Sequence, residues 1–88
     1  MKTLFKESFL NDIEALEDSS LKKRIREAIA RVEKAVAPRD IRSLKRLKGG
    51  DQCYRIKVGD YRLGLTLQDD AVVFVRCLHR KDISQDLP

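Results

Sequence analysis

Apolar side chains recur at helical spacing through the first half of the chain. A helix is predicted over residues 8–17, because apolar residues three and four positions apart share one face there. A longer helix is predicted over 21–37, and Pro38 ends it because proline disfavours a helical residue before it. A short strand at 2–5 precedes both helices, and 39–48 are expected to form a basic helical turn. The apolar stripe of the longer helix comprises Leu21, Ile25, Ile29, Val32 and Val36.

From residue 53 onward the spacing changes to strict alternation. This alternation predicts strands over 53–58, 61–67 and 71–79, and Gly59-Asp60 is typical of a type II′ turn between the first two. The predicted order is β-α-α-β-β-β, an α+β fold in which two helices pack on one face of a small antiparallel sheet. The 88 residues suit one domain, 1–88. The side chains expected to face the helices are Tyr54, Ile56, Val58, Tyr61, Leu63, Leu65 and Leu67.

The same alternation places cations on the opposite face of the sheet. On the last strand both faces hold apolar residues, and an outward Arg76 would carry Phe74 with it. Mutual repulsion among clustered cations favours an anionic ligand, and phosphate is the natural one because arginine presents a planar pair of donors. A solvated face without a ligand is the alternative. The cations that would share this surface are Arg55, Lys57, Arg62, Arg76 and Arg80.

The net charge of +5 is concentrated in the middle of the chain. Residues 1–20 carry two basic and five acidic side chains, 21–50 carry eleven basic and three acidic, and 51–88 carry six of each. The middle segment, at net +8, suits a polyanion or an acidic protein partner, and a solvated helix face would give the same tally. Further phosphate-binding residues are expected at Lys45, Arg46, Lys48 and Lys81.

The outward cations also suit metal-independent cleavage of RNA. The 2′-hydroxyl attacks the adjacent phosphate when a base accepts its proton and cations stabilise the developing charge. Lys57 is the expected base, because neighbouring cations favour its neutral amine. Arg62 is the expected charge-stabilising group, and Arg80 either stabilises charge too or assists the leaving oxygen. His79 is either a general acid or base, or a strand-end residue with a satisfied ring, and its inward alternation favours the second interpretation.

No metal site, cofactor or membrane segment is expected. His79, Cys53 and Cys77 lack the spacing of a ligand set or a redox motif, so both thiols are expected to be reduced and partly buried. No apolar run approaches the roughly 20 residues of a membrane span, and the first residues lack the apolar centre of a signal peptide. A cytoplasmic protein is the expectation.

Three motifs resemble the RelE/ParE toxin superfamily: LKG at 47–49, YRIKVGDYR at 54–62 and HRKDI at 79–83. The resemblance covers nearly the whole chain, because the two preceding helices also match the family layout. It implies a toxin of a type II toxin–antitoxin system, bound by a partner antitoxin in a hetero-oligomer. RelE-like members cleave messenger RNA, usually in the ribosomal A site, whereas ParE-like members inhibit DNA gyrase.

The resemblance also implies which residues act. Arg55, Lys57, Arg62 and Arg80 match the cationic positions at which RelE-like toxins cleave, whereas Ser84 stands where the family commonly has a tyrosine. A serine cannot stack on a base and is a poor proton acceptor. The main expectation is therefore a metal-independent, ribosome-dependent endoribonuclease that inhibits translation. The alternatives are a gyrase inhibitor and a member that binds antitoxin or RNA without cutting.

Overall fold

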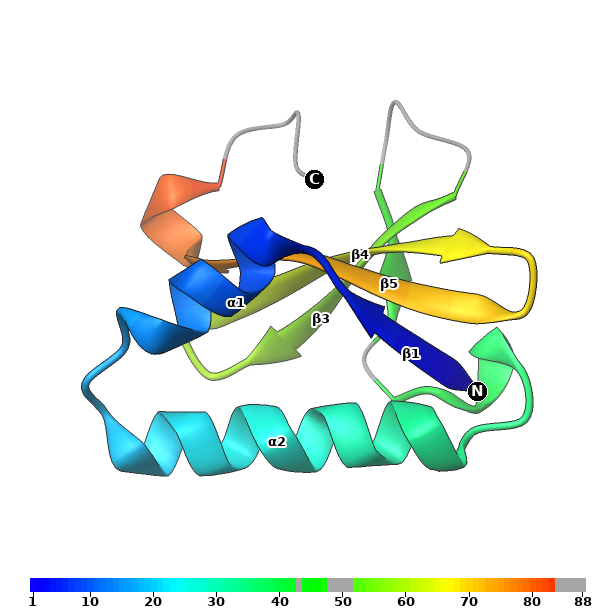
Figure 1. The fold of residues 1–88 in the computed structure, drawn as a ribbon, viewed down its shortest axis with the longest axis horizontal. Helices are drawn as coiled ribbons and strands as arrows, with labels where there is room; N and C mark the ends of the chain where they lie inside the picture. Colours follow the sequence, from blue (N-terminus) through cyan, green and yellow to red (C-terminus); the bar gives the residue numbers. More distant parts are fainter. Residues whose placement is uncertain (43, 48–51, 84–88) are drawn as a thin grey trace.

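Five strands form one mixed sheet, and two helices pack against it (Figure 1). The computed structural model describes residues 1–42, 44–47 and 52–83. The elements in chain order are β1 (Lys2–Phe5), α1 (Glu7–Glu14), α2 (Ser19–Lys34), the 3₁₀ helix η1 (Pro38–Asp40), β2 (Lys45–Arg46), β3 (Cys53–Val58), β4 (Tyr61–Gln68), β5 (Ala71–His79) and the 3₁₀ helix η2 (Arg80–Asp82).

The strands lie in the order β1-β5-β4-β3-β2. Strands β2 to β5 pair antiparallel, as predicted, and β1 joins the edge of the sheet parallel to β5. The predicted α+β fold is therefore confirmed, with a parallel edge strand as an added detail. Among the described residues of 39–48, the predicted helical turn is limited to η1, and the two-residue strand β2 follows it, which was not predicted.

Helix α2 lies along one side of the molecule and supplies much of the core (Figure 1). Its first turn is capped by Asp18, whose carboxylate accepts the Leu21 N–H at 3.0 Å. The helix ends at Lys34, and Val36 is consequently 88% exposed and does not extend the apolar stripe. No helix in the described part of the chain has the length and apolar character needed to cross a membrane.

One hydrophobic core fills the space between the helices and the inner face of the sheet. Every strand residue predicted to face the helices is buried in this core or packed against it. Three phenylalanines join β1, α1 and β5, because the ring centroids of Phe5, Phe9 and Phe74 lie 5.3–5.8 Å apart. The core thus fixes the positions of β3, β4 and β5, whose other face carries the predicted cations.

A β-bulge interrupts β5 between Phe74 and Arg76. Gly64 pairs with Arg76 while the next residue of β4 pairs with Phe74, so Val75 has no partner of its own on β4. The extra residue changes the alternation, and Phe74 and Cys77 both belong to the core although three positions separate them. The prediction that an outward Arg76 carries Phe74 with it is therefore wrong.

Candidate nucleic-acid interface

Strand register brings several cations together on the sheet face opposite the helices. Lys57 pairs directly with Arg62 across β3 and β4, and Lys45 pairs with Arg55 across β2 and β3. Directly paired residues on antiparallel neighbours point to the same face. That face is the outer one, because the alternate position Ile56 lies in the core at 2% exposure. Alternation along β3 and β4 therefore predicts the outward direction of Arg55, Lys57 and Arg62 correctly, whereas Lys45 joins them through β2, a strand that was not predicted.

Arg62 lies at the centre of the cluster. Its Nη1 donates to the carbonyl oxygens of Gly59 at 3.0 Å and Tyr61 at 2.9 Å, so the β3–β4 turn fixes the guanidinium. Partial burial lowers the pKa of Arg62, and the nearby charges of Arg55 and Arg80 lower it further. Three guanidinium groups consequently share one site, where each raises the electrostatic cost of the others and all attract an anion.

Arg80 joins the cluster from the end of β5. Its backbone N–H donates to the Asp60 carbonyl at 2.7 Å, and its Nε lies 3.8 Å from Asp60 Oδ1. Both side chains are more than half exposed, so this ion pair is weak and leaves Arg80 available to a stronger anion. The contact of Asp60 with Arg80 was not predicted from the sequence. The feature that could have indicated it is the position of Asp60 in the β3–β4 turn, next to the last residues of β5. The cationic face is hereafter defined as Lys45, Arg55, Lys57, Arg62 and Arg80.

His79 has a structural role beside the cationic face. Its Nδ1 accepts the Lys81 N–H at 3.1 Å and so caps η2. The ring also meets Tyr61 edge to face, with centroids 5.2 Å apart. The interpretation of His79 as a strand-end residue with a hydrogen-bonded ring is thus the one that fits the structure.

Arg76 lies on the outer side of the sheet as predicted, because it pairs with Gly64 and Gly64 pairs with Arg55, but an ion pair excludes it from the cationic face. Its Nε lies 2.8 Å from Asp12 Oδ2 and its Nη2 lies 3.1 Å from Oδ1, so α1 neutralises it through a two-point contact. This hydrogen bonding raises the pKa of Arg76, the opposite of the effect on Arg62. Asp12 reaches Arg76 because α1 lies along the edge of β5, where Ser8 Oγ also donates to the Val75 carbonyl at 2.6 Å.

Comparison with known proteins identifies the family. The model of the ParE toxin of the type II toxin–antitoxin system parDE matches residues 4–84. Toxin RelE3 of Methanocaldococcus jannaschii is 35% identical to this chain over 89 residues and is matched over 100% of both chains. The chain belongs to the RelE/ParE family of type II toxins.

Solved structures of the family agree with this assignment. In the RelB–RelE antitoxin–toxin complex from Methanococcus jannaschii, the matching chain has a TM-score of 0.76 at 32% identity, over 89% of this toxin and 91% of that chain. The archaeal RelE–RelB complex from Pyrococcus horikoshii OT3 gives a TM-score of 0.73 over 93% and 97% of the two chains. Its identity of 19% shows the shared fold alone.

The other predicted phosphate-binding residues of the toxin occupy different places. Lys81 is exposed on η2, next to Arg80. Arg46 pairs with Tyr54, and this register places it on the other face of the sheet from Lys45. Lys48 and Ser84 lie outside the described residues.

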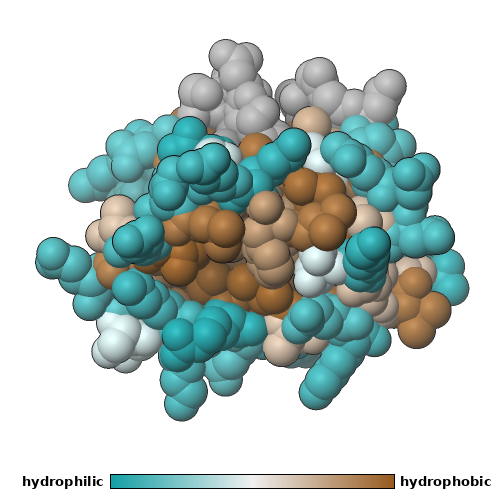
Figure 2. Space-filling model, viewed as in Figure 1, coloured by the Kyte–Doolittle hydropathy of each residue, from teal (hydrophilic) through white to brown (hydrophobic). Residues whose placement is uncertain are grey.

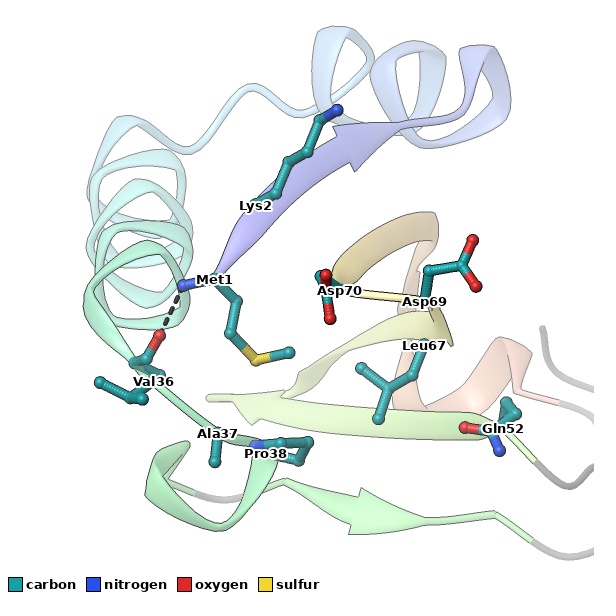
Figure 3. Close-up of a pocket in the computed structure, with 10 residues that line it drawn as sticks. Met1, Lys2, Val36, Ala37, Pro38, Gln52, Leu67, Asp69 and Asp70 are labelled. Carbon is teal, nitrogen blue, oxygen red and sulfur yellow. Dashed lines mark hydrogen bonds between the residues drawn. The ribbon is translucent and has the colours of Figure 1, made fainter.

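A cavity of about 800 Å³ lies beside Leu67, near the end of β4 (Figure 3). Arg62 lies near the other end of this strand. Asp69, Asp70 and Lys2 line the cavity, and none of the predicted site residues that the structure describes does. The Met1 amino group also lies there and donates to the carbonyls of Val32, Glu33 and Ala35 at the end of α2. Lys2 and the Met1 amino group offset the charges of Asp69 and Asp70, so this cavity lacks the excess of positive charge that a phosphate site needs and is not the candidate site.

Proposed function

We propose that this toxin is a metal-independent endoribonuclease that cleaves messenger RNA on the ribosome and so stops translation. The observation that carries the proposal is the shared site of Arg62, Arg55 and Arg80, in which burial and like charge already destabilise the guanidinium of Arg62. A phosphate that becomes more negative during cleavage relieves that repulsion, so the site favours the transition state over the bound ground state.

The residues of the cationic face divide the work of strand cleavage. Lys57 accepts the proton of the 2′-hydroxyl, whose oxygen forms a bond to the adjacent phosphorus while the bond to the 5′-oxygen breaks. Arg62, held by the β3–β4 turn, donates to the non-bridging oxygens on which charge develops. Arg55 binds the same phosphate, and Arg80 donates a hydrogen bond to the leaving oxygen. Water supplies the proton that the leaving 5′-oxygen takes up, and Lys57 returns its proton to solvent, so the products are a 2′,3′-cyclic phosphate and a 5′-hydroxyl.

The experiment that tests this proposal is cleavage of messenger RNA by the purified toxin with and without ribosomes, mapped by primer extension. Cuts at the A-site codon are expected with ribosomes, and Lys57→Ala should abolish them. Ser84→Tyr should increase cleavage if the residue that the family commonly has at this place limits the rate. Messenger RNA that stays intact with ribosomes and folded toxin would reject the proposal.

A gyrase inhibitor is the second candidate, because the matching family model is named for the ParE toxin. The two functions give different cellular responses. Induction of an endoribonuclease arrests translation, whereas inhibition of gyrase damages DNA while translation continues. Labelling of new protein and an SOS reporter in the same induced culture distinguish them.

The partner of the toxin is proposed to be an antitoxin with an amphipathic, acidic segment. A groove of about 240 Å³ lies between α1 and α2, where hydrophobic surface is exposed on this face of the molecule (Figure 2). Leu10 is 52% exposed and Phe5 is 40% exposed at this groove, and Lys22 and Arg26 line it too. Apolar side chains with acidic neighbours complement such a surface.

A further inference from the structure

The β3–β4 turn connects the cationic face to a charge on the other side of the sheet. Gly59 in this turn has a φ of +59°, and a Cβ at this position would lie 3.0 Å from Nη1 of Arg24. Arg24 belongs to α2, whose N-terminal half runs beside the turn (Figure 1). The carbonyl of Gly59 meanwhile accepts from Nη1 of Arg62. Two guanidinium groups, one from the helix and one from the sheet, therefore contact the same glycine.

Arg24 has no structural partner that accounts for its place. Within the described residues it makes no ion pair and no hydrogen bond, and it is exposed. The absence of a side chain at Gly59 is what permits the guanidinium to approach the turn so closely. Lys22 and Arg26, its neighbours on α2, line the apolar groove instead, so Arg24 is set apart from them by its direction.

We propose that the nucleic-acid surface continues from the cationic face around the β3–β4 turn onto α2, where Arg24 binds a phosphate flanking the one that Arg62 holds. The inference rests on the proposed function, since it requires that the toxin binds RNA. An RNA strand that crosses the turn meets Arg62 on one side of Gly59 and Arg24 on the other. Arg24 contributes binding but does not contact the reacting atoms.

The test measures how binding depends on salt. The probe is an RNA oligonucleotide with 2′-O-methyl riboses, which lacks the 2′-hydroxyl nucleophile and so cannot be cleaved by the proposed mechanism. Its binding is measured by fluorescence anisotropy at about 50 to 300 mM KCl. Each phosphate contact on a single strand contributes about 0.7 to the slope of log affinity against log salt. Arg24→Ala should lower the slope by about 0.7, and Arg24→Lys should restore most of it because the charge is retained.

Arg31→Ala is the matched control. Arg31 is an exposed arginine on the same helix, near its other end, so its removal changes net charge equally without touching the turn. The slope should be unchanged in Arg31→Ala. With a cleavable RNA, Arg24→Ala should raise KM several-fold and leave kcat unchanged.

The possible outcomes distinguish the role of Arg24 from the proposed function. Equal slopes for Arg24→Ala and Arg31→Ala, with tight binding by the wild-type toxin, overturn the role of Arg24 and leave the proposed function intact. A wild-type toxin that does not bind the oligonucleotide overturns the inference about Arg24, whereas the proposed function is decided separately, by cleavage of messenger RNA with ribosomes. A fall in kcat for Arg24→Ala at unchanged KM also contradicts the inference, because it would place the residue at the reacting atoms.

Discussion

Two arginines of this toxin differ mainly in what surrounds them. Arg76 forms an ion pair with Asp12 of α1. Arg62 instead donates hydrogen bonds to two backbone carbonyls and is repelled by the charges of Arg55 and Arg80. An arginine with a full countercharge has little to gain from a phosphate. An arginine crowded by like charge gains the attraction of the phosphate together with relief from its neighbours. Position relative to a carboxylate, more than residue type, thus distinguishes the site from the scaffold.

Arg62→Ala should lower the rate of RNA cleavage by about 10²–10³, because one charge-stabilising interaction at the phosphate is lost. The free energy of unfolding should hardly change, since the side chain lies outside the core. Leu65→Ala is the contrasting variant, because Leu65 is fully buried and the cavity should cost roughly 2–5 kcal/mol. Single-turnover cleavage and urea unfolding measure both quantities. Undiminished cleavage by Arg62→Ala would exclude the cationic face as the active site.

The stability of the toxin should fall as pH rises from about 9 toward 12, because of Cys77. Burial, and secondarily the charge of Asp12, raise the pKa of this thiol from 9.0 to about 12. Above pH 9 the unfolded chain therefore loses a proton that the folded state retains, which favours unfolding. Urea unfolding at pH 8, 9.5 and 11 should show this decline. Cys77→Ala, although less stable at pH 8, should show a shallower decline, and an equally steep one would contradict the assignment.

At the level of elements, patterns along one segment were easier to predict than contacts between segments. Strands β3 and β4 follow strict alternation, so their inward residues and outward cations are correct. The bulge at Val75 and the two-residue strand β2 depend on how β5 and β3 pair with their neighbours, and no local period encodes that pairing. The loss of Arg76 from the cationic face has the same origin, because its partner Asp12 is 64 positions away in the sequence.

Asp12→Ala should destabilise the contact between α1 and β5. The carboxylate accepts two hydrogen bonds from Arg76 and one from the Cys77 N–H at 2.9 Å, and its removal leaves these donors without their partner. A loss of about 1–3 kcal/mol in the free energy of unfolding is expected. Asp12→Asn keeps an acceptor for Cys77 and should cost less. Chemical denaturation of the wild type and the two variants measures the order of their stabilities. Equal stability of Asp12→Ala and wild type would mean that the hydrogen bonds of Asp12 to β5 do not stabilise the fold.

At the scale of the whole molecule, two surfaces of different character lie on different sides of the fold. The cationic face covers the outer side of β3 and β4, and the apolar groove lies between the helices. Charge dominates the first surface, so its binding should weaken steeply with salt. Apolar burial dominates the second, with Lys22 and Arg26 at its border, so its binding should weaken less steeply with salt. The antitoxin proposed to dock on the helices would therefore use contacts chemically different from those proposed to bind RNA.

Leu10→Glu should test this separation. Leu10 is half exposed at the groove, so a glutamate there places a charge against the apolar side chains of the antitoxin without opening a cavity in the core. The affinity for the antitoxin should fall at least about tenfold, which corresponds to roughly 1.4 kcal/mol, while RNA cleavage by the released toxin stays unchanged. Val36→Glu is the matched control, because Val36 is an exposed apolar residue away from the groove. If Leu10→Glu and Val36→Glu bind the antitoxin equally well in calorimetry, the groove between α1 and α2 is not its docking site.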